Sequence, residues 1–404
     1  MSARAATPTM TGQREAGAPV VLLDPGDFTP AYDFALQAGL SRIGVPNLHV
    51  GKCGFDEMEP VGARWDLFYP MADRLGGGRL VKGFEHAVGL ARLTARLVHL
   101  EPRVVHMQWA PLPPVDRLFL PLLRMRAPLV ITAHDSNPYN GNGSALMKLG
   151  YGGLLGRADA VIVHTRQARA RLLQAGVRSD RLHILPHGLL HPPRDATGPA
   201  RAPGGRIRLL QLGKIKPYKG VDLLLEALGR LSADERSRFE LHVAGKPYMD
   251  MAPLEGLIER HGLQDCVRLE LGFLDEARME ELLDKADAAL FAYREIDASG
   301  VALSAVSRGL PILASAIGGF AEMFEDGDGA ELVPMGDVDA IAGVLRRWAA
   351  DPSRLDELRR RMCRRRDAIP GWDEIAARTV DVYERAARNW RGENRSPRVL
   401  PEGS

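Results

Sequence analysis

Short apolar runs alternate with longer amphipathic stretches along most of the chain. Each run has about the four to eight residues of a buried strand, and turn-forming residues usually follow it. In the first half of the chain the pattern predicts strands at Pro19–Asp24, Arg103–Trp109, Pro128–Asp135, Asp159–Thr165 and Leu182–Gly188. Helices are predicted between most of these strands, notably near Ala31–Ile43 and at Phe84–Glu101.

The same alternation restarts after a stretch rich in Pro, Gly and Ala, residues 191–205. Strands are predicted there at Arg206–Gly213, Phe239–Gly245, Cys266–Gly272, Ala288–Tyr293 and Gly309–Ser315. Apolar strands that alternate with helices indicate parallel sheets covered on both faces. The predicted fold class is therefore α/β, with two doubly wound, Rossmann-like domains facing each other across a cleft. Ligands are expected at the carboxyl ends of the strands.

Composition also predicts the domain boundaries. The first residues lack the apolar core of a signal peptide and are expected to form a disordered leader. The predicted order is a leader at 1–18, a first domain at 19–190, a linker at 191–205, a second domain at 206–369, a long amphipathic helix at 370–392 and a tail at 393–404.

Charge and cysteine content limit the kinds of binding partner and of cellular compartment that are expected. With 53 basic and 51 acidic residues the net charge is only +2, which argues against a nucleic-acid binder. The basic run Leu358–Arg366 is predicted to be a solvated helix face rather than a phosphate or membrane site. Three scattered cysteines form no disulfide framework and no zinc cluster, so a reducing, cytoplasmic compartment is expected. The apolar stretch Val115–Ile131 is interrupted by Pro and Arg, so it is predicted to contact a membrane surface at most, without crossing it.

The stretch Leu212–Gly220 follows the first predicted strand of the second domain and precedes a helix. Its lysines Lys214 and Lys219 stand beside glycines, including Gly213, that let a ligand approach the backbone. Such a turn can meet a diphosphate with ammonium groups and with the amides of the next helix. The alternative is a solvent-exposed basic turn.

A second anion-binding turn is predicted between Tyr293 and Ser315. Ser299 can cap a helix that begins near Gly300, where the exposed amides of Gly300 and Val301 carry partial positive charge. Glu295 and Asp297 would repel a phosphate, so they are expected to accept hydrogen bonds from sugar hydroxyls. The alternative is a helix that is merely capped.

Histidines recur where predicted strands end. Such a residue can bind a substrate or move a proton, although a core histidine bonded to a carbonyl is the commoner case. The four are His106, His134, His164 and His187. The four-residue spacing of His183, His187 and His191 resembles a metal-binding helix face, but prolines and a glycine exclude a helix there. No metal and no cofactor are therefore expected.

Four segments in this order carry a family resemblance: "LGKIKPYKGVDLLLEAL", "FELHVAG", "YREIDASGVALSAVSRGLPILAS" and "GGFAEMFEDGDGAELVPMGDVDAIA". They resemble the C-terminal domain of the large nucleotide-sugar glycosyltransferase family that includes sucrose synthase and bacterial mannosyltransferases. The resemblance covers the chain well from Arg206 onward. It covers the N-terminal domain through "ITAHD", "ADAVIVHT" and "ILPHG". It implies the GT-B fold and, in most members, retention of anomeric configuration.

The resemblance also implies roles for particular residues. Lys214, where the family usually has Arg, and Lys219 would neutralise the donor diphosphate, so that no metal is needed. Ser299, Gly300 and Val301 match a turn whose amides face the donor, and Gly213 lies on the donor side too. His134 matches a strand-end histidine near the donor sugar, and Gly26 lies in a loop near the reaction centre. His106 and His187 are assigned to the acceptor side. The last helix would pack back on the first domain, with Trp372 and Tyr383 as packing residues.

One position departs from the family pattern, whose acidic pair is Glu-x7-Glu. Counting back from Gly309 places Ser304 at the second Glu and Ile296 at the first. Glu295 is one residue away and is the first candidate for contact with the donor sugar, and Asp297 is the other. Ser304 can offer ribose a hydroxyl but no carboxylate.

The sequence therefore predicts a metal-independent enzyme that transfers a hexose from a UDP-, GDP- or ADP-linked sugar. The expected acceptor is a saccharide or a lipid-linked saccharide, in polysaccharide, glycolipid or glycoconjugate synthesis. Peripheral contact with the inner face of the membrane is expected. The alternatives are an epimerase or a phosphorylase of similar fold, and a protein that binds nucleotide sugars without turnover.

Overall fold

The computed structural model describes residues 17–55, 58, 61–71, 78–136, 145–194 and 205–395. The chain divides into two compact units, which are described separately below. Unit 1 comprises residues 1–187 and 370–404, and unit 2 comprises residues 188–369. The greater part of the predicted leader, linker and tail lies outside the described residues.

Unit 1 is built on a parallel sheet of seven strands. Their order across the sheet is β3-β2-β1-β4-β5-β6-β7. The strands are β1 (Val20–Leu23), β2 (Asn47–Lys52), β3 (Arg64–Phe68), β4 (Val104–Met107), β5 (Leu129–Thr132), β6 (Ala160–Val163) and β7 (Leu182–Ile184). The strand order reverses direction between β1 and β4, which is the switch point where open α/β sheets bind ligands.

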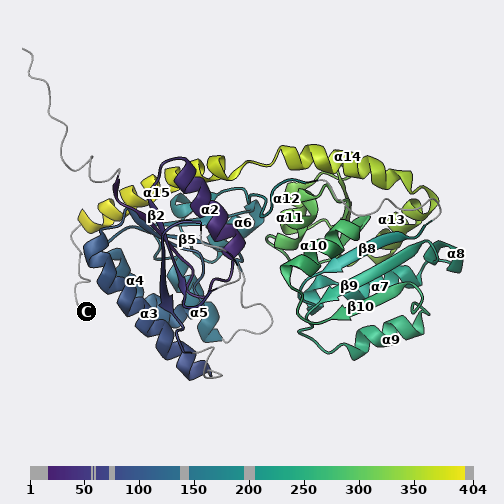
Figure 1. The fold of residues 1–404 in the computed structure, drawn as a ribbon, viewed down its shortest axis with the longest axis horizontal. Helices are drawn as coiled ribbons and strands as arrows, with labels where there is room; N and C mark the ends of the chain where they lie inside the picture. Colours follow the sequence, from purple (N-terminus) through teal and green to yellow (C-terminus); the bar gives the residue numbers. More distant parts are fainter. Residues whose placement is uncertain are drawn as a thin grey trace, which may run out of the picture. The chain divides into compact units, whose positions relative to one another are not determined.

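The helices of unit 1 lie on both faces of this sheet, with α3 and α4 on one face and α2 and α15 on the other (Figure 1). They are α2 (Pro30–Arg42), α3 (Arg79–Leu100), α4 (Pro113–Arg124), α5 (Ala145–Leu155), α6 (Arg166–Gln174), the 3-10 turn η1 (Ser179–Arg181) and α15 (Trp372–Arg395). Local chemistry fixes several of their ends. Thr165, for example, caps α6 by accepting a hydrogen bond from the amide of Ala168.

The C-terminal helix α15 packs against α2 and forms part of unit 1. The Tyr383 hydroxyl lies 2.8 Å from Nδ1 of His106, and the Trp390 indole donates to the carbonyl of Arg124 at 2.6 Å. Asn389 donates to the carbonyl of Asp159 at 2.9 Å. The helix therefore covers this face of the sheet with both apolar packing and hydrogen bonds from its side chains.

The strands β2 and β3 are two elements that the apolar pattern did not predict. β2 carries Asn47, His49 and Lys52, which interrupt its apolar run. β3 is an edge strand, with Arg64 and Asp66 among its five residues. An edge strand needs only one buried face, so its sequence shows no continuous apolar run.

Unit 2 is built on a second parallel sheet, of six strands in the order β10-β9-β8-β11-β12-β13. The strands are β8 (Ile207–Leu212), β9 (Phe239–Gly245), β10 (Val267–Leu271), β11 (Ala288–Phe291), β12 (Ile312–Ser315) and β13 (Ala330–Val333). The strand order reverses between β8 and β11. The edge strand β13 was not predicted, whereas each of the other five overlaps a predicted strand.

The helices of unit 2 follow its strands in sequence. They are the 3-10 turn η2 (Pro217–Lys219), α7 (Val221–Gly229), α8 (Ala233–Arg236), α9 (Ala252–Arg260), α10 (Glu276–Lys285), α11 (Gly300–Ser307), α12 (Gly318–Met323), α13 (Val338–Ala350) and α14 (Ser353–Asp367). The basic run lies on α14, where Leu358 and Met362 are buried between arginines. The predicted helix is confirmed, and Leu358 and Met362 give it a buried apolar face that was not predicted.

Both units are α/β layers around parallel sheets, so the predicted fold class is confirmed. Within the described residues, no helix is both long and apolar enough to cross a membrane.

Candidate functional site

The switch point of unit 2 contains a cavity of about 430 Å³. The loops that follow β8, β9 and β10 line it, together with residues from α10 and the start of α11. The lining residues are Gly213, Lys214, Tyr218, Lys219, Gly245, Lys246, Tyr248, Gly272, Phe273, Leu274, Met279 and Val301. Among these described residues three lysines carry positive charge and none carries a carboxylate, so the cavity suits an anion with an apolar part.

Lys219 is held rigidly in this cavity. Its side chain lies over the ring of Tyr293, with Nζ 5.2 Å from the ring centroid, and only 8% of the residue is exposed. Burial lowers the pKa of Lys219, because the protein interior solvates an ammonium less well than water does. A bound anion would restore that missing solvation.

Two glycines allow the backbone to fold closely around Lys219. Gly213 has φ +103°, and a Cβ on it would lie 3.2 Å from Nζ of Lys219 and 3.3 Å from Cγ2 of Val301. Gly245 has φ +145°, and a Cβ there would lie 2.2 Å from the carbonyl oxygen of Gly213. A side chain at either position would therefore displace the residues that line the cavity.

Three lysines surround the ring of Tyr248, a residue that follows β9. Nζ of Lys214, Lys216 and Lys246 lies 5.9, 5.8 and 5.8 Å from the centre of the Tyr248 ring. Lys246 and Tyr248 were not among the predicted site residues. They could have been selected from their position just after β9, because β8 and β9 are parallel neighbours whose carboxyl ends lie at the same edge of the sheet.

Arg294 fixes the turn after β11 against the lysine loop. Its amide donates to the carbonyl of Tyr218 at 2.7 Å, and its guanidinium donates to the carbonyl of Pro217 at 2.8 Å. The same guanidinium pairs with both carboxylate oxygens of Asp222, at 2.9 and 2.6 Å. The two predicted anion-binding turns are therefore joined in one structure, through a residue that the sequence did not single out.

The predicted acidic residues lie in that turn. Glu295 is half-buried and Asp297 is 7% exposed, and neither lines the cavity. The hydroxyl of Ser299 accepts a hydrogen bond from the amide of Ala302 at 3.2 Å, so it caps α11. Gly300 begins that helix, and Val301 brings its first turn to the cavity wall.

The side chain of Ser304 points back into its own helix. Its hydroxyl donates to the carbonyl of Gly300 at 3.1 Å, and the residue is 9% exposed. The geometry favours a local helical role for this hydroxyl. Contact between Ser304 and ribose remains a prediction.

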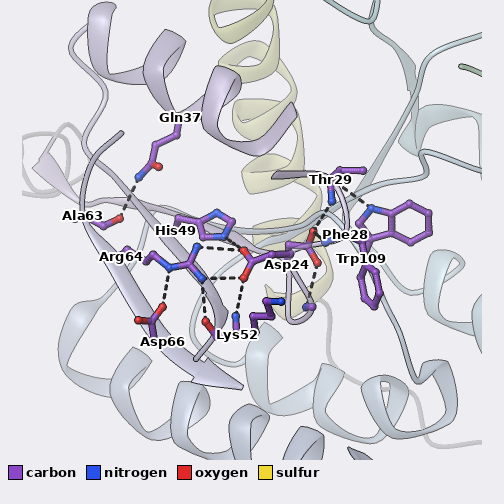
Figure 2. Close-up of polar contacts among 12 residues, drawn as sticks. Asp24, Phe28, Thr29, Gln37, His49, Lys52, Ala63, Arg64, Asp66 and Trp109 are labelled. Carbon is purple, nitrogen blue, oxygen red and sulfur yellow. Dashed lines mark hydrogen bonds and ion pairs between the residues drawn. The ribbon is translucent and has the colours of Figure 1, made fainter. Parts of the chain in front are cut away.

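In unit 1, Gly26 lies in the loop after β1, which wraps around the carboxylate of Asp24. Figure 2 shows this carboxylate beside Phe28 and Thr29. This carboxylate accepts hydrogen bonds from the amides of Gly26, Phe28 and Thr29 at 3.2, 2.6 and 3.1 Å. The side chain that organises the loop is thus Asp24, at the end of β1, which the sequence reading did not select.

A second carboxylate, that of Asp27, fixes the other side of the loop. It lies 2.8 Å from Nε2 of His49, accepts from Arg64 at 2.8 Å and accepts from the amide of Lys52 at 2.9 Å. Burial favours the neutral form, but the His49 and Arg64 hydrogen bonds outweigh it and lower the pKa of Asp27.

Asp33 on α2 is an unusual buried acid next to this loop. It is 0% exposed, and among the described residues neither of its carboxyl oxygens has a hydrogen-bond partner. Burial and the neighbouring Asp24 carboxylate raise its pKa well above the usual range. Burial also raises the pKa of Asp24. The pair therefore favours a protonated Asp33.

The histidine candidates of unit 1 lie in two environments. His106 is fully buried and contacts Thr132 and Tyr383, and burial lowers its pKa to about 3. That geometry favours a structural role. His134 and His187 lie further along the same sheet edge, each beside the ring of Tyr32.

Sequence comparisons agree with this architecture. Residues 197–366 match the family described as glycosyl transferases group 1, and residues 68–189 match the family described as Glycosyltransferase Family 4. Together the two matches confirm the resemblance to this group of glycosyltransferases that the sequence motifs indicated.

Two curated relatives match part of the chain. The MMP alpha-(1->4)-mannosyltransferase of Mycolicibacterium hassiacum is 32% identical over 235 residues, covering 56% of this chain and 54% of that protein. The D-inositol 3-phosphate glycosyltransferase of Streptomyces coelicolor is 31% identical over 258 residues, covering 59% and 55%. The match thus spans about half the length of either relative.

Solved structures share the fold at low sequence identity. Sucrose-phosphate synthase from Thermosynechococcus elongatus has a TM-score of 0.71 at 20% identity and covers 91% of this chain and 98% of that one. The lipopolysaccharide glycosyltransferase WaaG has a TM-score of 0.64 at 18% identity and covers 90% and 99%. Anabaena Alr3699/HepE in complex with UDP and glucose has a TM-score of 0.63 at 16% identity and covers 94% and 100%.

Proposed function

We propose that the protein is a glycosyltransferase that moves a hexose from a nucleotide diphosphate sugar to an acceptor hydroxyl, in glycan or glycolipid synthesis. The observation that carries this proposal is the cationic cavity at the switch point of unit 2. It combines a buried lysine with glycines that bring the backbone close. The group 1 family match and the relatives' names support the same reaction class.

In this proposal the lysines stabilise the leaving nucleotide. Lys219, desolvated over Tyr293, is placed to attract a diphosphate more strongly than an exposed lysine would. Negative charge grows on the diphosphate as the glycosidic bond breaks, and a fixed ammonium group stabilises that charge without reorganising. Lys214 would act beside it, so the chemistry needs no divalent metal. Retention of configuration is the outcome that the family resemblance favours.

The apolar wall of the same cavity would take the rest of the nucleotide. Phe273, Leu274 and Met279 line it, while Lys214 and Lys246 give it charge. We assign the base to the apolar wall and the diphosphate to the lysines. The donor sugar would then lie near the turn that carries Glu295 and Asp297. Gly26 and His134, which belong to unit 1, remain predicted donor-side residues.

Ligand screening tests the donor assignment directly. A nucleoside diphosphate that binds the native state should raise the melting temperature, and at 100 times its Kd the gain is about 2.7 kcal/mol. UDP, GDP and ADP should be compared at equal concentration with and without EDTA. Stabilisation by one of them that is unchanged by EDTA supports the proposal. No stabilisation by any of them would contradict the proposed donor class.

Transfer assays then separate the reaction classes. With the nucleotide sugar that binds best, we expect sugar transfer to saccharide or lipid-linked acceptors, and proton NMR of the product would give the anomeric outcome. An epimerase would convert the nucleotide sugar without an acceptor, and a phosphorylase would require inorganic phosphate. A protein that only binds would show affinity without turnover. The comparisons give no support to these three alternatives.

Contact with the inner face of the membrane is part of the proposal. Leu118 on α4 and Met125 just after it are 75% and 67% exposed, and on α3, Leu80 and Phe84 are 90% and 71% exposed. Sedimentation with anionic phospholipid vesicles would test this contact. Leu118→Glu with Met125→Glu should reduce vesicle binding while transfer to a water-soluble acceptor continues. Equal sedimentation of this variant and the wild type would contradict the contact.

A further inference from the structure

Three histidines meet at the sheet edge of unit 1. His134 follows β5, His164 follows β6 and His187 follows β7, and these strands are neighbours in the sheet. One ring nitrogen from each residue can be chosen so that all three atoms lie within 4.8 Å of one another. The residues are far apart in sequence, so the parallel strand order brings them together.

Hydrogen bonds orient two of the three rings. Nε2 of His134 lies 3.1 Å from Oε1 of Gln108, which can only accept, so the proton of this ring is on Nε2. Nδ1 of His164 lies 3.1 Å from the carbonyl oxygen of Leu185, so the proton of that ring is on Nδ1. The other nitrogen of each ring, Nδ1 of His134 and Nε2 of His164, therefore carries a lone pair. A histidine that binds a metal ion usually donates its second N–H to a carbonyl or carboxylate in this way.

Aromatic side chains hold the same rings in place. The ring of Tyr32 lies 4.6, 5.5 and 5.0 Å from those of His134, His164 and His187. Trp109 stacks on His134 with an interplanar angle of 17°. These ring contacts leave the three imidazoles little room to turn away from one another.

We propose that His134, His164 and His187 form a binding site for a divalent transition metal ion of the zinc class. Three imidazole nitrogen ligands suit zinc and leave a fourth position for water. In a tetrahedral zinc site with Zn–N bonds of about 2.0–2.1 Å, ligand nitrogens lie about 3.4 Å apart. The site lies in unit 1 and uses His134 and His187, which are also candidates for the donor and acceptor sides of the proposed transferase. The metal titration below does not require transferase activity.

A second cluster of possible metal ligands differs from the three histidines, because charged neighbours already pair with it. His191, Glu276 and Glu280 also bring ligand atoms within 4.8 Å of one another. Arg308 contacts Glu280 at 3.1 Å and Arg194 contacts it at 3.6 Å, so guanidinium groups already balance this carboxylate. That cluster is better described as an ion-pair network.

Metal titration of the full chain tests the site. The protein should carry no histidine tag and should be treated with EDTA before calorimetric titration with Zn²⁺ or Co²⁺ alone. We expect one tight site per chain, and the Co²⁺ form should show the visible absorption bands of a tetrahedral, nitrogen-ligated ion. A chain that binds no Co²⁺ tightly, or that gives the spectrum of hexaaqua Co²⁺, would overturn the proposal.

Variants separate this site from adventitious binding. His164→Ala and His187→Ala should each weaken metal binding by at least about 100-fold, and Gln108→Ala should weaken it by about 10–100-fold by releasing the His134 ring. His183→Ala, on β7 but outside the cluster, is the matched control and should bind as the wild type does. Circular dichroism in EDTA would show whether each variant folds. If a ligand variant does not fold, the wild-type Co²⁺ spectrum and the Gln108→Ala affinity decide. Affinities equal to wild type in folded variants would assign the ion elsewhere.

Discussion

The two units share the same order over six strands, and unit 1 adds a seventh, but they present different chemistry at equivalent edges of their sheets. In unit 2 the loops after β8 and β9 bring lysines and glycines around a cavity. In unit 1 the loop after β1 folds around buried carboxylates, and a histidine follows each of the strands β5, β6 and β7. A parallel sheet with helices on both faces thus fixes where a ligand can bind, whereas the residues after each strand decide which ligand binds.

The strongest way to break this comparison is to remove the buried charge of unit 2. Lys219→Ala should lower kcat/KM for the nucleotide sugar by at least about tenfold, because the leaving diphosphate loses a desolvated cation. Lys285→Ala, which removes an exposed lysine paired with Glu281, is the matched control. Unchanged kinetics in a folded Lys219 variant would remove this residue from the site.

The backbone of the same cavity gives the next largest effect. Gly213→Ala places a Cβ at φ +103°, 3.2 Å from Nζ of Lys219. We expect a loss of about 1–3 kcal/mol in unfolding free energy and weaker nucleotide binding, measured by denaturant titration and calorimetry. Gly343→Ala, inside α13 with its nearest neighbour 3.9 Å away, should be neutral or slightly stabilising. If the Gly213→Ala variant were as stable as Gly343→Ala, the turn would accommodate a Cβ without strain, which would contradict this prediction.

The residues of this cavity also show how much of the site could be predicted from the sequence. Lys214, Lys219 and Gly213 lie within one short stretch, so local spacing was enough to select them. Lys246 and Phe273 reach the cavity from the ends of β9 and β10, and only the strand order places those ends beside β8. The apolar pattern predicted the alternation of strands and helices, but it cannot give the order of strands across a sheet.

Unit 1 shows the same limit in two further ways. The strand β2 carries polar residues because His49 pairs with Asp27 inside the protein, so its pattern did not read as buried. The histidines after β5, β6 and β7 looked like separate residues in sequence. The three rings come together by packing against Tyr32, which is distant from them in sequence. The spacing of residues along the chain does not predict such a contact.

Substitutions in the acidic turn after β11 would show which acid of unit 2 contacts the donor sugar. Glu295→Gln and Asp297→Asn each remove a charge while keeping the shape of the side chain. The residue that holds the donor sugar should lose about tenfold in kcat/KM, as expected for a lost charge-assisted hydrogen bond, and the other should change much less. Both variants should be measured with the same donor. Equal, small effects would place the sugar away from this turn.

The buried acid of unit 1 should respond to pH. The pKa of Asp33 is raised in the folded state, so the folded protein keeps this proton at pH values where the unfolded chain loses it. The stabilisation is complete below the unfolded pKa of about 3.9 and is lost as pH rises toward the folded pKa. Asp33→Asn has no such proton, so its stability relative to wild type should increase as pH rises above the unfolded pKa. Exposed Asp234→Asn is the control. Parallel pH profiles of Asp33→Asn and the wild type would contradict a protonated Asp33.

The smallest effect is expected at Ser304, where the family pattern has its second acid. The hydroxyl already donates to the carbonyl of Gly300, an oxygen that α11 itself can satisfy. Ser304→Ala should therefore change the unfolding free energy by less than about 1 kcal/mol and kcat/KM by less than about threefold. Kinetics with the ribosyl and 2′-deoxyribosyl forms of the same donor would isolate any contact with ribose. A large loss in Ser304→Ala that disappears with the deoxy donor would mean that this hydroxyl leaves its helix to bind ribose. A small loss with both donors would mean that unit 2 binds its nucleotide chiefly through the lysines and the apolar wall.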